Sequence, residues 1–118
     1  MLKMKLRLHN GSLRLRLSQS EVSRLRETGK VEDLVVFHPG NELLYALETG
    51  VVREPEATYD HSKIRVTLPE RLATEWIESD QTGIEASTGT LTLLIEKDFQ
   101  CLHRSAEQGE DSFPNPLA

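Results

Sequence analysis

The residues with the clearest potential for chemistry are five cations near the amino terminus, which alternate with apolar residues. They are Lys3, Lys5, Arg7, Arg14 and Arg16, and no acidic residue occurs among the first 20 positions. A row of cations on one face of a β-ribbon is typical of surfaces that bind phosphate groups or nucleic acid. One interpretation of this segment is therefore an anion-binding or nucleic-acid-binding hairpin.

The rest of the chain offers a second explanation for these cations. Residues 21–118 carry nine basic and nineteen acidic residues, which amounts to a net charge of −10 against +5 for the first segment. The segment also has no aromatic side chain on which a base could stack. We therefore favour neutralisation of the cations by carboxylates of the same chain. The candidates on neighbouring strands are Glu42, Glu48, Glu85 and Glu96.

A second possible reactive group lies near the carboxyl terminus. Cys101 and His103 fall on the same side of an extended segment, as in a partial metal site or a Cys–His nucleophile pair. Zinc requires at least three protein ligands, and His9, His38 and His61 have no suitable spacing from this pair. We keep a metal or thiol site as the least favoured alternative, and we expect no cofactor and no bound metal.

Two further combinations resemble catalytic groups only in composition. Asp60, His61 and Ser62 include the three residue types of a catalytic triad, but consecutive side chains point in different directions. Glu75 and Glu78 lie one helical turn apart, on the side of a predicted helix that faces solvent. Neither combination predicts an enzyme, and we lean towards a protein without enzymatic activity.

The elements that position the cations begin with a hairpin. Leucines and Met4 alternate with the basic residues over 2–8 and 13–17, and Asn10 and Gly11 form a two-residue turn between these runs. This turn places Arg7 opposite Arg14 and Lys5 opposite Arg16. The hairpin is therefore expected to have one apolar face and one basic face.

The elements after the hairpin form a repeated pattern. Residues 12–48 and 62–97 each contain an alternating strand, a short helix, a Thr-Gly pair and two further strands. We predict an α+β fold of two β-α-β-β repeats with an extra N-terminal hairpin strand, closed into a compact, partly barrel-like sheet with two helices. Residues 1–103 form a single domain in this interpretation, residues 49–60 are an irregular join between the repeats, and residues 104–118 are a mostly irregular tail. Within this tail, Phe113 is expected to pack on its own domain.

Two resemblances follow from these motifs. The segment Arg65-Val66-Thr67-Leu68-Pro69-Glu70, with its helix and the strand pair that turns at Thr88-Gly89, resembles the swapped-hairpin unit of AbrB and MazE-type bacterial proteins over residues 62–97. That resemblance implies two interlocked units, although the family's Gly-Asp pair before its hairpin is absent here. The whole chain, with its Phe113-Pro114-Asn115-Pro116 motif, also resembles a family of small uncharacterised bacterial proteins, a domain of unknown function.

Composition sets the remaining expectations. A single cysteine excludes an internal disulfide, and the longest apolar runs are only a few residues long. We expect a cytoplasmic protein without a membrane contact. The leading function is a small non-enzymatic binding or interaction module, with a protein partner favoured over nucleic acid. The alternative is a nucleic-acid-binding regulator that uses the basic hairpin.

Overall fold

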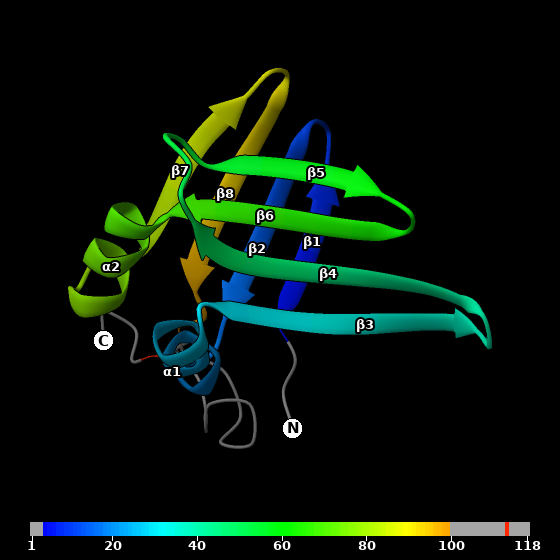
Figure 1. The fold of residues 1–118 in the computed structure, drawn as a ribbon, viewed down its shortest axis with the longest axis horizontal. Helices are drawn as coiled ribbons and strands as arrows, with labels where there is room; N and C mark the ends of the chain where they lie inside the picture. Colours follow the sequence, from blue (N-terminus) through cyan, green and yellow to red (C-terminus); the bar gives the residue numbers. More distant parts are fainter. Residues whose placement is uncertain (1–3, 100–112, 114–118) are drawn as a thin grey trace.

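Eight strands and two helices form the protein in a computed structural model that describes residues 4–99 and residue 113. The first half contains β1 (Lys5–His9), β2 (Ser12–Leu17), α1 (Gln19–Thr28), β3 (Lys30–His38) and β4 (Asn41–Gly50). The second half contains β5 (Glu56–Asp60), β6 (Lys63–Pro69), α2 (Glu70–Glu78), β7 (Gly83–Thr88) and β8 (Leu91–Lys97). The predicted α+β class is confirmed, and both halves have the element order β-β-α-β-β (Figure 1).

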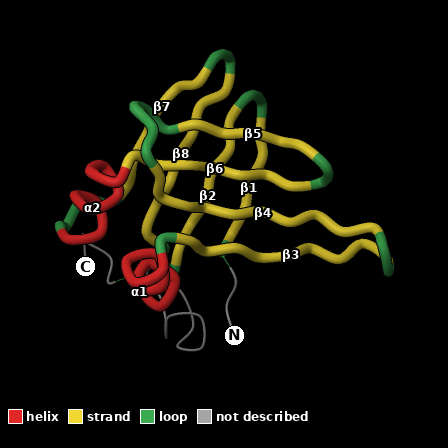
Figure 2. Tube along the Cα trace, viewed as in Figure 1, coloured by secondary structure: helices red, strands yellow, loops and turns green. Residues whose placement is uncertain are grey.

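The strands form two four-stranded sheets rather than one closed barrel. Sheet A has the order β1-β2-β8-β7, and sheet B has the order β3-β4-β6-β5. Each sheet combines two hairpins, one from each half, which meet through the parallel pairs β2–β8 and β4–β6. The strands of the two sheets cross, and both helices lie at one end of the molecule (Figure 2).

The N-terminal hairpin has the predicted register. Arg7 lies opposite Arg14 and Lys5 opposite Arg16, and the turn residues Asn10 and Gly11 have φ values of 36° and 79°. Positive φ at both central turn residues suits the right-handed twist of the two strands, and Asn and Gly tolerate it well. Local sequence therefore determines this element almost completely.

The hydrophobic core lies between the two sheets and beneath the helices. Alternate residues of β2, β6 and β8 enter it, and each helix contributes one large side chain, Leu25 from α1 and Trp76 from α2. Both of these side chains are buried, and Trp76 is fully excluded from solvent. The core therefore depends on strands that are distant in the sequence and meet through parallel pairing.

The two helices begin in different ways. Ser18 caps α1 in a capping box, because its hydroxyl accepts from the Glu21 N–H while the Glu21 carboxylate accepts from the Ser18 N–H at 2.9 Å. Helix α2 begins after Pro69, which forms no side-chain cap hydrogen bond. Gly29, with a φ of 79°, ends α1 in the left-handed conformation.

The irregular join predicted over 49–60 is wrong in its second half. Residues Glu56–Asp60 form β5, which pairs antiparallel with β6. The N-terminal strand β1 is therefore not an extra element, since β5 occupies the matching place at the edge of sheet B. Strand β5 escaped prediction because it is short and lies at a sheet edge, so only Ala57 and Tyr59 provide its apolar alternation.

Near the carboxyl terminus of the chain, Phe113 packs on the core, as predicted. Its N–H donates to the Asp98 carbonyl at 2.7 Å, and its ring lies 5.6 Å from that of Phe99, measured between centroids. The other residues of the predicted tail, 104–112 and 114–118, lie outside the described residues. Neither described helix is long and apolar enough to cross a membrane.

Candidate functional site

The cations of the N-terminal hairpin are the first candidate site. We call Lys5, Arg7, Arg14 and Arg16 the basic hairpin face, and Lys3, the fifth predicted cation, lies outside the described residues. Strand β8 runs parallel to β2 and places Glu96 directly beside Arg16. The carboxyl end of this strand therefore brings acidic side chains next to the basic hairpin face.

Three of the four cations are paired with carboxylates. The Lys5 ammonium lies 2.9 Å from the Asp98 carboxylate, and the Nε atoms of Arg14 and Arg16 each lie 3.4 Å from the same Glu96 oxygen. The Arg14 Nε is buried, and within the described residues it forms no hydrogen bond. Its contact with Glu96 is therefore only electrostatic. These contacts are the intramolecular pairing that the sequence favoured. Glu96 is one of the four predicted partners, and Asp98 is an unpredicted one.

Arg7 differs from its neighbours. Its side chain is exposed, and within residues 4–99 it forms no ion pair. As far as the described residues go, the basic hairpin face therefore offers one free cation to an outside partner. Whether the face as a whole binds anions remains a prediction.

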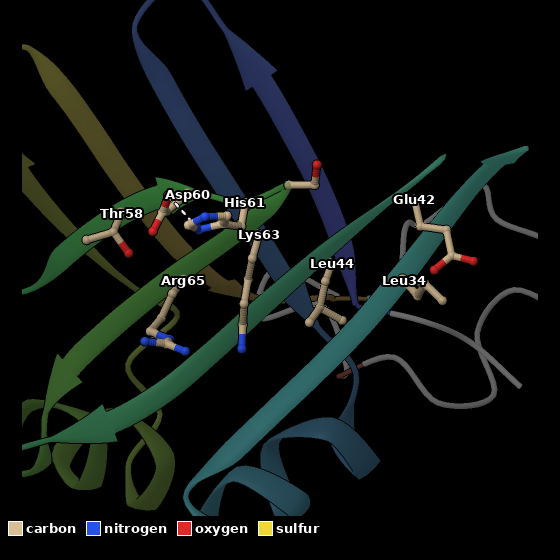
Figure 3. Close-up of a pocket in the computed structure, with 9 residues that line it drawn as sticks. Leu34, Glu42, Leu44, Thr58, Asp60, His61, Lys63 and Arg65 are labelled. Carbon is tan, nitrogen blue, oxygen red and sulfur yellow. Dashed lines mark ion pairs between the residues drawn. The ribbon is translucent and has the colours of Figure 1, made fainter. Parts of the chain in front are cut away.

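A second candidate is a hollow of about 630 Å³ on the outer face of sheet B. Figure 3 shows Lys63 and Arg65 projecting from β6 on the same side of the sheet, with Glu42 farther away on β4. Arg65 is already bound to Glu48 at 2.9 Å. This surface is open and of mixed charge, so it has no clear preference for one ligand.

The triad-like residues lie at the rim of this hollow. The Nδ1 atom of His61 lies 2.9 Å from the Asp60 carboxylate, but both side chains are largely in solvent. In the described part of the chain, the Ser62 hydroxyl forms no hydrogen bond with His61. A general base acts best when its surroundings fix its orientation, and this exposed pair lacks such surroundings.

A third candidate is an apolar hollow of about 430 Å³ at the end of the molecule opposite the helices. Both sheets contribute to it, and we call it the apolar groove. Its main lining residues are Leu8, Leu13 and Leu91 from sheet A and Leu43, Ile64 and Tyr59 from sheet B. Leu8 is 58% exposed and Tyr59 is 71% exposed, so two large apolar side chains of the groove face solvent.

The apolar groove has edge strands on both sides. Leu8 lies on β1, the edge of sheet A, and Tyr59 lies on β5, the edge of sheet B. The two strands hold matching positions in the two halves, since each precedes a two-residue turn that leads to the next strand. The groove is thus symmetric in architecture, with Leu8 matching Tyr59 and Leu13 matching Ile64.

Metal or thiol chemistry is the least favoured of the alternatives. Among the described residues, no group of three or more His, Cys, Asp or Glu side chains could hold a metal ion. Cys101 and His103, which carried the alternative hypothesis, lie outside the described residues.

A family model covers residues 4–117, which is almost the whole chain. The chain belongs to DUF7009, a family of unknown function. No curated protein and no solved structure matches it. The predicted membership of a family of unknown function is confirmed.

Two ionisable groups of this DUF7009 chain have raised pKa values and lie away from the candidate surfaces. Burial raises the pKa of Glu21, although hydrogen bonds from Ser18 oppose the shift. Burial also raises the pKa of Tyr45, with smaller contributions from Asp33 and Glu21, so its hydroxyl remains a donor to the Met4 carbonyl. Tyr45 thus joins the residue before β1 to sheet B, and Glu21 caps α1, so both groups have a structural explanation.

Lys97 is a further buried group with structural partners. Burial lowers the pKa of its ammonium, which donates to the Ser79 carbonyl at 2.7 Å. The ammonium also lies 5.9 Å from the Trp76 ring centroid and 5.5 Å from that of Phe113. These contacts connect β8 and Phe113 to α2 and to the residue that follows it, and they explain why a lysine is buried here.

Sequence reasoning missed the apolar groove. The hairpin pattern identified Leu8 and Leu13 as apolar-face residues. However, no feature of the neighbouring sequence indicated that sheet B leaves the Leu8 side chain uncovered. Tyr59 fell within the predicted join. Its signal was available in the alternation Glu56-Ala57-Thr58-Tyr59-Asp60 before a two-residue turn, which repeats the layout of β1 before its own turn.

Proposed function

We propose that this protein is a non-enzymatic interaction module that binds a protein segment in the apolar groove. The observation that carries the proposal is the exposure of Leu8 and Tyr59 on either side of a hollow lined by both sheets. Exposed apolar side chains that gather around a concavity typically mark a protein-binding site. A cytoplasmic location fits the single cysteine, which allows no internal disulfide.

A protein partner is favoured over nucleic acid by the charges. The chain has a net charge of −5, and Glu96 and Asp98 already form ion pairs with three cations of the basic hairpin face. A nucleic acid would have to displace these contacts while approaching a negatively charged protein. Arg7 alone provides too little charge for strong phosphate binding.

We also infer that the two halves arose by duplication of a swapped-hairpin unit like that of AbrB and MazE-type proteins. Support comes from the sheet orders, since exchanging β1–β4 with β5–β8 converts the order of sheet A into that of sheet B. Each half also gives one hairpin to each sheet. Under this proposal, residues 12–48 and 62–97 are the repeats, and the apolar groove lies on their axis of symmetry.

Selection of peptides from a displayed random library tests the proposed function. The protein is used at nanomolar concentration, and selected peptides are then measured against the Leu8→Ser, Tyr59→Ser double variant. Because both side chains are exposed, this variant should fold normally, while peptide affinity should fall more than about tenfold. Val51→Ser is the matched control, since Val51 is 99% exposed and lies outside the groove. Peptides that bind the double variant as well as the wild type would contradict the proposal.

A further inference from the structure

We infer that the apolar groove is occupied by a second copy of this chain, in a dimer in which β1 of each copy pairs with β5 of the other. This inference rests on the proposed function, because it names the protein segment that the groove accepts. Three features of the two edge strands carry it: their free backbone groups, their exposed apolar side chains and their opposite charges.

Among residues 4–99, the backbone of β1 has a free edge beside the groove. In a hairpin with a two-residue turn, the two residues that flank the turn form both backbone hydrogen bonds with each other. Along the two strands, such hydrogen-bonded pairs then alternate with pairs whose backbone groups point outward. Arg7 and His9 therefore bond to β2, while the N–H and C=O groups of Leu6 and Leu8 point away from sheet A. Met4, which also points to this side, is occupied by sheet B, because its N–H donates to Asp33 at 2.8 Å and its carbonyl accepts from Tyr45.

Strand β5 has the same arrangement at the edge of sheet B. Its turn follows Asp60, so Thr58 and Asp60 bond to β6 while the backbone groups of Ala57 and Tyr59 point outward. Within the described residues, each copy thus presents two short free edges, one on each side of the apolar groove. Unpaired strand edges of this kind are templates for adding another strand.

The charges of the two edges determine which edges can pair. The outer face of β1 carries Lys5, Arg7 and His9, whereas that of β5 carries Glu56, Thr58 and Asp60. Pairing β1 with a second β1 would oppose cations, and pairing β5 with a second β5 would oppose carboxylates. Like charges across a strand pair are destabilising, so only the mixed pairing is complementary.

An antiparallel pairing of β1 with β5 of the second copy brings together the apolar faces of the two strands and also their oppositely charged faces. When Leu6 lies opposite Tyr59 of the second copy and Leu8 opposite Ala57, the outward backbone groups meet and the apolar side chains share the groove. Lys5 then lies opposite Asp60, and Arg7 lies between Glu56 and Asp60. Arg7 and Glu56 form no ion pair within the described residues of one copy, so they are available for this contact. Two such pairings related by a twofold axis close the dimer.

Charge reversal at Arg7 and Glu56 tests this arrangement by sedimentation equilibrium of the full chain over the micromolar range. We expect the wild type to dimerise, and we expect Arg7→Glu and Glu56→Arg each to raise the dimer dissociation constant by at least about tenfold, because each change affects two contacts per dimer. The double variant with both changes should recover part of the lost affinity, because it restores opposite charges at positions 7 and 56 while position 7 keeps a like charge beside Asp60. The matched controls are Arg71→Glu and Glu75→Arg on α2, which make the same charge changes on exposed residues away from the groove and should have little effect.

Other outcomes would overturn the inference in distinguishable ways. A single reversal that tightens the dimer would indicate pairing of like edges, and reversals without effect would place the interface elsewhere. A protein that stays monomeric at high micromolar concentration would exclude a second copy as the occupant, while peptide binding in the groove would still support the proposed function. As a second readout, hydrogen exchange at the Leu8 and Tyr59 amides should slow as the wild-type dimer forms, and unchanged rates in the dimer would contradict strand pairing.

Discussion

The two halves of the molecule share their interior and differ at their edges. At matching positions in the two sheets, Arg14 pairs with Glu96 across β2 and β8, and Arg65 pairs with Glu48 across β6 and β4. The edge strands diverge instead, since β1 is basic where β5 is acidic. The pairing between the halves is therefore a requirement of the fold, whereas the edge strands are free to acquire a binding role.

The largest expected effect comes from separating the halves at the exposed loop between β4 and β5. Fragments 1–51 and 52–118 should each fail to fold as monomers, because β2 and β6 form their parallel pairs only with strands of the other half. Mixing equal amounts should restore the native circular dichroism spectrum. Unmixed fragments are the control, and a fragment that folds as a monomer would show that the halves are independent domains.

The next largest effect concerns the helix starts. Ser18→Ala should lower the free energy of unfolding by about 1–2 kcal/mol, because it removes the cap of α1 and one hydrogen bond to the buried Glu21 carboxylate. Helix α2 has no equivalent side-chain cap to lose. Urea unfolding measures the change, with Ser23→Ala within α1 as a control. Equal losses for the two variants would contradict a specific role for the capping box.

Removing the carboxylates of the two matching ion pairs should have unequal effects. Glu96→Gln should cost about 1 kcal/mol, because it leaves Arg14 and Arg16 uncompensated, whereas Glu48→Gln should cost about half as much, since only Arg65 loses its partner. Both differences should shrink at high salt, because solvent screens these partly exposed pairs. If Glu48→Gln proved the more damaging change, the basic hairpin face would not depend on Glu96.

A smaller effect is expected from pH. Because burial raises the pKa of Glu21 above its usual value of 4.5, the folded state binds this proton more tightly than the unfolded state. The resulting stability is fully present below about pH 4.5 and is lost as pH rises through the folded pKa. Glu21→Gln removes this titration, so the wild type should gain stability relative to the variant as pH falls from neutral. Parallel pH profiles from thermal melts would contradict a raised pKa.

The sequence was a good guide to local structure and a poor one to contacts between halves. Alternation and the Asn10-Gly11 turn predicted the first hairpin and its register, because these depend on neighbouring residues. Asp98 was missed as the partner of Lys5, because their contact requires the parallel pairing of β2 and β8. The apolar groove was missed for a related reason, since it forms only where the edges of two crossing sheets meet.

The smallest expected effect on stability separates Arg7 from Arg14. Arg7→Ala should change the free energy of unfolding by less than about 0.5 kcal/mol, because the side chain is exposed and forms no ion pair within residues 4–99. Arg14→Ala should lower the free energy of unfolding by more, since Arg14 is partly buried and compensated by Glu96.

The double variant with both changes should lose stability. Duplex DNA binding, measured by fluorescence anisotropy, should stay negligible for the wild type and for this variant. Salt-sensitive binding by the wild type, abolished in a double variant that still melts normally, would instead assign the basic hairpin face to nucleic acid. Arg7 is the informative residue here, because it is the cation of that face that the fold itself does not use.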